Sequence, residues 1–191
     1  MIKKILIITL LAIGLVGCSQ LDKLSQSGSK LLLISLTGND LEGSAGSPVI
    51  FSDVSVNNSI INDNCVASLS AVLLDCRTGC EATYYQAVNI DQVDVSFRRP
   101  DGKNTPGVDV PYSFTQPVSM LIQIDEILEL PFVIIRHVAK LESPLIELRS
   151  LGQDKVLQII ADVTIHGKDL SGRRVQPVKG SITIWAANFG D

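Results

Sequence analysis

The sequence predicts an all-β protein: an antiparallel β-sandwich with one short helix, preceded by a leader and a polar tether. Apolar and polar side chains alternate along several short segments, most clearly at residues 93–97 and 157–165. Turn signals such as Pro100-Asp101-Gly102 separate these segments. Aromatic residues make up only 5% of the chain, so the core must consist of Val, Ile and Leu. Since β-branched residues favour strands, composition and periodicity agree.

The strands are expected at regular intervals, with turn residues between them. A short helix is expected at residues 145–151, because Ser143-Pro144 offers an N-cap and a first-turn proline and Gly152 can end it. The last two strands are expected to form a hairpin through a turn at residues 167–172. The expected strands are residues 31–36 (a first or edge strand), 49–56, 65–75, 93–97, 118–124, 133–138, 157–165 and 178–184.

The first 17 residues have the pattern of a secretory signal peptide. Lys3 and Lys4 precede residues 5–16, in which only Thr9 is polar. This run is too short to span a hydrocarbon core of about 30 Å, which needs roughly 20 apolar residues. A basic start, a short apolar run and small residues at its end are typical of a cleaved leader.

A four-residue motif ends the leader. Leu15-Val16-Gly17-Cys18 resembles the lipobox of bacterial lipoproteins, in which a small residue precedes the cysteine that accepts lipid. The resemblance implies cleavage between Gly17 and Cys18, diacylglycerol on the Cys18 thiol and a fatty acid such as palmitate on the new amino terminus. Two or three acyl chains anchor a protein stably. Ser19 stands where an aspartate tends to retain enterobacterial lipoproteins in the inner membrane, so the outer membrane is favoured.

The chain after the cleavage site divides into a tether and a domain. Residues 18–46 are assigned to the lipidated cysteine and a flexible tether, within which residues 31–36 are the expected first strand. The polar, Ser-rich residues 19–30 would reach at most about 40 Å when fully extended. Residues 47–191 are assigned to the β-sandwich domain.

The charge of the mature chain makes nucleic acid an improbable partner. The full chain has a net charge of −4, and without Lys3 and Lys4 it has 14 basic and 20 acidic side chains, a net charge of −6. Such a domain has no electrostatic attraction to phosphate backbones, and anionic lipid headgroups would repel it.

Two tracts resemble known sandwich proteins. Residues 97–102 with 106–111, and residues 161–169 with 171–173, are similar to segments of uncharacterised bacterial secreted and lipoprotein sandwiches. The second tract also resembles the last hairpin of bacterial immunoglobulin-like domains. Seven or eight strands in about 145 residues agree with an immunoglobulin-like sandwich. The resemblance implies a fold and a compartment, and no activity.

Three cysteines remain after lipidation of Cys18: Cys65, Cys76 and Cys80. In an exported protein we expect one intramolecular disulfide among them, with the third thiol free or bridged to another molecule. Cys76 with Cys80 would close a tight and geometrically demanding loop. Zinc is a weaker alternative, because neither spacing is C-x2-C and the chain has only two histidines.

No catalytic, cofactor or metal residue is assigned. Residues 42–46 approach a G-x-S-x-G elbow but lack its first glycine and lie in the expected tether. His137 and His166 are expected to be structural, and the pair Asp125-Glu126 is expected to be solvated loop charge. Four further carboxylates near a Gly-containing loop make calcium a weaker alternative. They are Asp91, Asp94, Asp101 and Asp109.

The sequence therefore favours a non-enzymatic lipoprotein of the bacterial cell envelope. Its domain would bind a partner, such as an envelope protein or a glycan, or would serve a structural role. The alternative is an envelope hydrolase whose residues converge only in three dimensions. A hydrolase should show a deep pocket that holds His137 or His166 with a carboxylate, whereas a binding module should present a flat or edge-strand surface.

Overall fold

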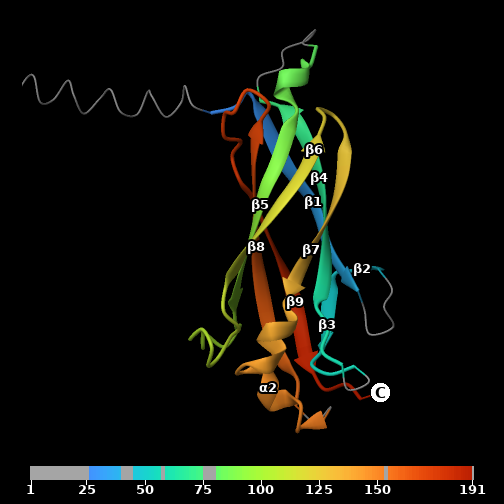
Figure 1. Ribbon diagram of the computed structural model, residues 1–191, viewed down its shortest axis with the longest axis vertical. Helices are drawn as coiled ribbons and strands as arrows, with labels where there is room; N and C mark the ends of the chain where they lie inside the picture. Colours follow the sequence, from blue (N-terminus) through green and yellow to red (C-terminus); the bar gives the residue numbers. More distant parts are fainter. Residues whose placement is uncertain (1–25, 40–44, 57–58, 75–80, 153–154, 191) are drawn as a thin grey trace, which may run out of the picture.

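Two curled β-sheets packed face to face dominate the computed structural model (Figure 1). The structure describes residues 26–39, 45–56, 59–74, 81–152 and 155–190. The four-stranded sheet has the order β2 (Ala45–Ser47), β1 (Ser29–Asn39), β4 (Asp63–Leu73), β7 (Ile127–Ile135). The five-stranded sheet has the order β3 (Val49–Asp53), β9 (Val178–Ala187), β8 (Leu157–Asp169), β5 (Val88–Arg98), β6 (Phe114–Ile122).

The strand order is that of an immunoglobulin-like sandwich. Strands β1, β4 and β7 occupy the places of A, B and E, whereas β9, β8, β5 and β6 occupy those of G, F, C and C′. All neighbouring strands are antiparallel except β3, which runs parallel to β9. The predicted all-β sandwich with one short helix is confirmed.

The core lies between the sheets and is mainly aliphatic. Along β8, the residues from Leu157 to Asp169 alternate between buried and more exposed positions, as the period-two pattern predicted. Val93 and Val95 of β5 are buried in the same way. Phe97 and Phe132 are the only aromatic side chains among the described residues of the core. The low aromatic content therefore agrees with how the two sheets pack.

The sandwich begins earlier than residue 47. Strand β1 pairs with β4 from Ser29 opposite Leu73 to Gly38 opposite Cys65, so it is a full member of the sheet. The inward side chain of Leu31 is completely buried. The backbone N–H of Ser27 also donates to the Arg174 carbonyl at 3.0 Å. The segment expected to be a tether with one short strand therefore contributes to the core, because β1 pairs with β4 from Ser29 to Gly38 and turns Leu31 inward.

Two of the short helical segments lie at the end of the sandwich opposite the start of β1 (Figure 1). The 3-10 helix η2 (His137–Leu141) follows β7 and leads to α2 (Leu145–Leu148), which lies where the sequence predicted a helix. The structure places Pro144 at the N-cap, one position later than expected, and the Ser143 hydroxyl donates to the Glu147 carboxylate at 2.7 Å. A second 3-10 helix, η1 (Tyr84–Gln86), precedes β5.

Lys140 of η2 is a completely buried cation. Its Nζ donates to the Asp63 carboxylate at 2.8 Å and to the Asp53 carbonyl at 2.7 Å. The Ser52 hydroxyl donates to the other oxygen of Asp63 at 2.5 Å. Burial raises the pKa of Asp63, and the Lys140 ammonium only partly offsets this effect. These bonds connect η2 to the ends of β3 and β4.

Candidate functional site

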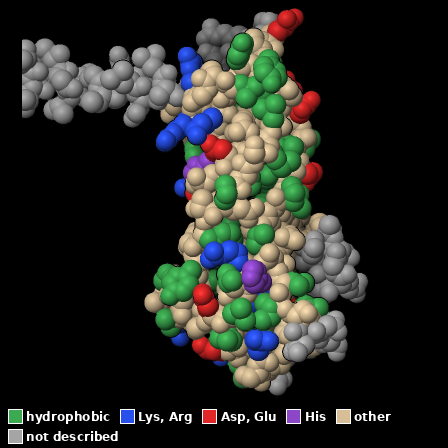
Figure 2. Space-filling view, viewed as in Figure 1, with side chains coloured by type: hydrophobic (Ala, Val, Ile, Leu, Met, Phe, Trp, Pro, Cys, Tyr) green, Lys and Arg blue, Asp and Glu red, His purple; other side chains and the backbone are tan. Residues whose placement is uncertain are grey.

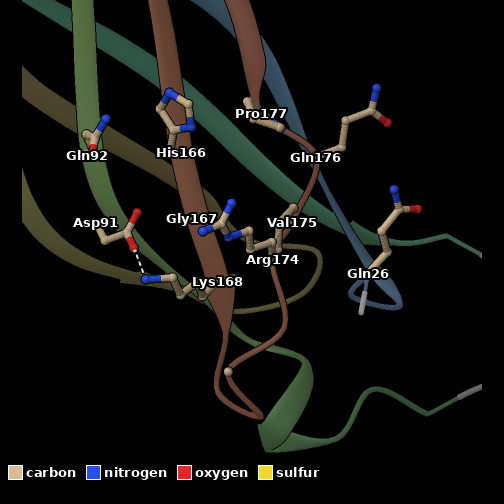
Figure 3. Close-up of a pocket in the computed structure, with 11 residues that line it drawn as sticks. Gln26, Asp91, Gln92, His166, Gly167, Lys168, Arg174, Val175, Gln176 and Pro177 are labelled. Atoms are coloured by element: carbon tan, nitrogen blue, oxygen red, sulfur yellow. Dashed lines mark ion pairs between the residues drawn. The ribbon is translucent and has the colours of Figure 1, made fainter. Parts of the chain in front are cut away.

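Among the described residues, a hollow lies on the outer face of the five-stranded sheet, where the chain enters the sandwich (Figure 3). We call it the polar hollow. It has a volume of about 860 Å³ and opens to solvent. Its walls come from three segments: the start of the described chain, the paired strands β5 and β8, and the loop before β9. The lining residues are Gln26, Asp91, Gln92, His166, Gly167, Lys168, Gly172, Arg174, Val175, Gln176 and Pro177.

A β-bulge shapes one wall of the polar hollow. The pairing of β5 with both neighbours shifts register between Ile90 and Gln92. Ile90 and Val93 remain in the core, so Asp91 and Gln92 both line the hollow. The Asp91 carboxylate forms an ion pair with Lys168 at 2.9 Å (Figure 3). Bulges commonly re-aim side chains in this way, and an uninterrupted strand would have turned one of these two inward.

His166 belongs to a hydrogen-bonded group centred on Asp94. Its Nε2 lies 2.8 Å from one carboxylate oxygen of Asp94. The other oxygen accepts the Thr115 hydroxyl at 2.7 Å and the Gln92 amide at 2.8 Å. Partial burial would raise the pKa of Asp94, but these hydrogen bonds and His166 outweigh burial and hold the pKa below its ordinary value. Asp94 is therefore a carboxylate that orients His166.

The other side of the polar hollow offers free hydrogen-bonding groups. The side chains of Arg174, Gln176 and Gln26 line it, and none has a side-chain hydrogen bond or ion pair within the described part of the chain. Figure 3 places Gln26 and Gln176 opposite the Asp91–Lys168 pair, with Arg174 between them. Figure 2 shows Lys and Arg side chains near the start of the described chain, and others in the middle and lower parts of the same face.

Asp169 fixes the loop that carries Arg174. One of its oxygens accepts the backbone N–H groups of Ser171 at 3.0 Å and Arg173 at 2.9 Å, and the Ser171 hydroxyl at 2.6 Å. Burial would raise the pKa of Asp169, but these bonds and one from the Ser27 hydroxyl lower it. Strand β8 ends at Asp169, so the turn expected at residues 167–172 begins after this residue.

Asp169→Asn is expected to lower the free energy of unfolding by about 1–3 kcal/mol at pH 7, because an amide replaces a carboxylate that accepts several bonds. Because the pKa of Asp169 is lower in the folded state, its carboxylate stabilises the fold at pH values above the ordinary pKa near 4. This stabilisation is lost as the pH falls through the folded-state pKa. Urea unfolding at pH 7 and at pH 2 checks this. The two proteins should differ at pH 7 and converge at pH 2, and a constant difference would contradict it.

The smaller hollow lies between the start of β6 and the segment after β7. We call it the Arg136 hollow. Its volume is about 400 Å³. The guanidinium carbon of Arg136 lies 4.5 Å from the centroid of the Phe114 ring. The lining residues are Asn62, Phe114, Thr115, Gln116, Val133, Arg136, His137 and Val138.

The structure separates the two histidines. His137 lines the Arg136 hollow, and its backbone N–H donates to the Asn62 side-chain oxygen at 2.6 Å. His166 lines the polar hollow, and its ring lies beside the Asp94 carboxylate. A histidine next to a carboxylate in a pocket is the feature that we expected of a hydrolase. Asp125 occupies a turn with a φ of 65°. Residues 42–44 of the expected elbow lie outside the described residues.

The four aspartates considered for calcium do not converge. Asp91 pairs with Lys168 and Asp94 with His166, whereas the Asp101 carboxylate pairs with Arg99. Asp109 accepts the backbone N–H of Thr105 at 3.1 Å. No group of three metal-ligating side chains is present among the described residues. These four carboxylates therefore form no common ligand set: Asp91 and Asp94 lie on β5 with different partners, whereas Asp101 and Asp109 lie in the loop after β5.

The cysteines are only partly described. Cys65 is a free thiol on the core face of β4, and burial raises its pKa to about 12. Strand β8 carries no cysteine, so the inter-sheet disulfide of antibody domains cannot form between these two strands. Gly17, Cys18, Cys76 and Cys80 lie outside the described residues. One disulfide among the three later cysteines therefore stays a prediction.

Sequence reasoning considered Asp91, His137 and His166 but missed other residues that shape the two hollows. Arg174 and Gln176 follow a predicted turn and have no motif that marks them. Arg136 fell inside the strand expected at residues 133–138 and has no motif that marks it. The only local signal was the basic pair Arg173-Arg174, which by itself indicates no site.

No helix in the described part of the chain is long and apolar enough to cross a membrane. In comparisons with family models and with curated proteins, no match to this chain was found. The function must therefore be inferred from the residues of the two hollows.

Proposed function

We propose that this chain is a lipoprotein of the bacterial cell envelope, anchored through Cys18, and that its β-sandwich binds an acidic glycan in the polar hollow without catalysing a reaction. The observation that carries the proposal is the convergence of Gln26, Arg174 and Gln176 on one hollow of about 860 Å³, with side chains that have no hydrogen-bond partner among the described residues. Such groups normally find partners, and on an open surface the partner is water or a ligand.

The chemistry of these groups favours a ligand with hydroxyl and carboxylate groups. A guanidinium such as Arg174 matches a carboxylate with two parallel hydrogen bonds. The amides of Gln26 and Gln176 can both donate to and accept from hydroxyl groups. The described lining of the polar hollow contains no aromatic side chain, so hydrogen bonds and charge would supply recognition. Envelope glycans that carry acidic sugars present this combination.

The alternative function, a hydrolase, needs a nucleophile within reach of His166. Among the described residues that line the polar hollow, none is Ser, Thr, Cys or Tyr. The nearby Thr115 hydroxyl donates to Asp94 and not to the imidazole. The pair of His166 and Asp94 thus resembles the base and orienting group of a triad without its third member. This arrangement supports binding over hydrolysis.

The anchor would hold the polar hollow close to the membrane. Gln26 lines the hollow, and seven residues separate it from Cys18 in the sequence. Even fully extended, that segment reaches roughly 25 Å. A ligand in the polar hollow would therefore lie near the membrane that holds the lipid, which for Ser19 at the second position is the outer membrane.

Arg174→Gln is expected to weaken binding of a carboxylate-bearing oligosaccharide by about 10–100-fold, because charge-assisted hydrogen bonds to the ligand are lost. Calorimetric titration of the detergent-solubilised full chain with peptidoglycan-derived oligosaccharides measures this. Arg98→Gln is the matched control, since Arg98 lies on the same sheet face but pairs with Asp162 at 2.8 Å outside the hollow. Equal affinities for wild type and Arg174→Gln would reject the polar hollow as the site.

A further inference from the structure

The Arg136 hollow contains a cation that no acid neutralises. Arg136 directly follows β7, and its guanidinium covers the ring of Phe114 at 4.5 Å. Contact with an aromatic face holds a guanidinium in place without neutralising its charge. No ion pair joins Arg136 to an acidic side chain in the described part of the chain. The hollow therefore has a net positive charge at a fixed position.

The Nε atom of Arg136 is also the only buried side-chain nitrogen or oxygen that lacks a hydrogen-bond partner among the described residues. Buried donors of this kind are rare in folded proteins, and each one calls for an explanation. A guanidinium in a merely structural role usually satisfies its donors with carbonyl or carboxylate oxygens. A group from outside the chain that binds the Arg136 guanidinium would explain this unsatisfied donor.

The walls of the Arg136 hollow restrict what that group can be. Phe114, Val133 and Val138 supply apolar surface. The Gln116 side-chain oxygen accepts the Val133 N–H at 3.2 Å, so its amide nitrogen remains free to donate. His137 is oriented by Asn62, whose side-chain oxygen lies 3.1 Å from Nδ1. A volume of about 400 Å³ suits one carboxylate with a short apolar neighbour.

The hollow also lies between two strand edges. Strand β6 is the last strand of the five-stranded sheet, and β7 is the last strand of the four-stranded sheet. In the described part of the chain, each pairs with a named strand on one side only, and the Val133 N–H of β7 already donates to Gln116. An extended peptide could use the remaining backbone groups of these edges. A peptide end offers such a backbone together with a terminal carboxylate and a side chain.

We infer that the Arg136 hollow is a second binding site, which takes the C-terminal carboxylate of a peptide ending in an apolar residue. Arg136 binds the carboxylate, the Gln116 amide donates to the same end group, and Val133 and Val138 contact the terminal side chain. This site is separate from the polar hollow and does not depend on lipidation of Cys18.

The test uses the mature chain with Cys18→Ser, which retains every described residue, and an acetylated tripeptide ending in valine. Calorimetric titration should detect the free acid, and the C-terminally amidated peptide should bind at least tenfold more weakly. Arg136→Met should weaken binding of the acid at least tenfold, because methionine keeps the contact with Phe114 but lacks the charge. Arg174→Met, in the polar hollow, should leave peptide affinity unchanged.

Thermal unfolding without peptide separates this site from a structural role. Arg136→Met removes a buried donor that has no partner, so its Tm should equal that of wild type or exceed it by a few °C. Arg136→Lys keeps the charge without the planar guanidinium and should bind the acid several-fold more weakly than wild type. Equal binding of acid and amide, unchanged affinity of Arg136→Met, or no peptide binding together with a large fall in the Tm of Arg136→Met would overturn the inference.

Discussion

Lys140→Ala is expected to lower the free energy of unfolding by about 3–5 kcal/mol, because it leaves the buried Asp63 carboxylate without its cation. Lys140 Nζ makes hydrogen bonds of 2.8 Å to Asp63 and 2.7 Å to the Asp53 carbonyl. Both acceptors lie at the ends of strands, and Lys140 brings η2 against them. Denaturant unfolding monitored by circular dichroism measures the loss.

Lys168→Ala is the matched control. Its ammonium also pairs with an aspartate, at 2.9 Å, but about half of the Lys168 side chain is exposed. Exposed pairs of this kind contribute about 0–1 kcal/mol, so the control should differ little from wild type. The double variant Lys140→Met with Asp63→Leu should recover much of the loss, since it removes both buried charges together. A loss below about 1 kcal/mol for Lys140→Ala would show that the pair is dispensable.

Cys18→Ser is expected to abolish lipidation completely and to leave uncleaved or mislocalised precursor. The reason is chemical: a thioether to diacylglycerol requires a thiol, and Leu15-Val16-Gly17-Cys18 is the only lipobox-like motif at the end of the apolar leader. Metabolic labelling with a radioactive fatty acid, followed by membrane fractionation, measures the effect. Ser19→Ala is the control and should keep its label, because it leaves the motif intact. Equal label on wild type and Cys18→Ser would reject the anchor.

Much of the fold was predictable because strand periodicity is local. The alternation at residues 93–97 and 157–165 depends only on neighbouring side chains, and these segments lie within β5 and β8. The helix near residue 145 was predictable for the same reason, from a proline and a glycine within ten residues. The start of the sandwich was placed too late, because the Ser- and Gly-rich residues on either side of β1 resemble a linker when they are considered without β4.

The sequence by itself determined the all-β class, the aliphatic core and the acidic charge, and it predicted the leader and the lipobox. The two hollows are formed by segments far apart in the sequence, so only the tertiary structure shows them. His166 meets Asp94 across 72 residues, and Lys140 meets Asp63 across 77. Such pairs depend on strand register and on the bulge at Asp91, and moving a strand by one residue sends its side chains to the other face. Register follows from the packing of both sheets together, so no short segment of the sequence specifies it.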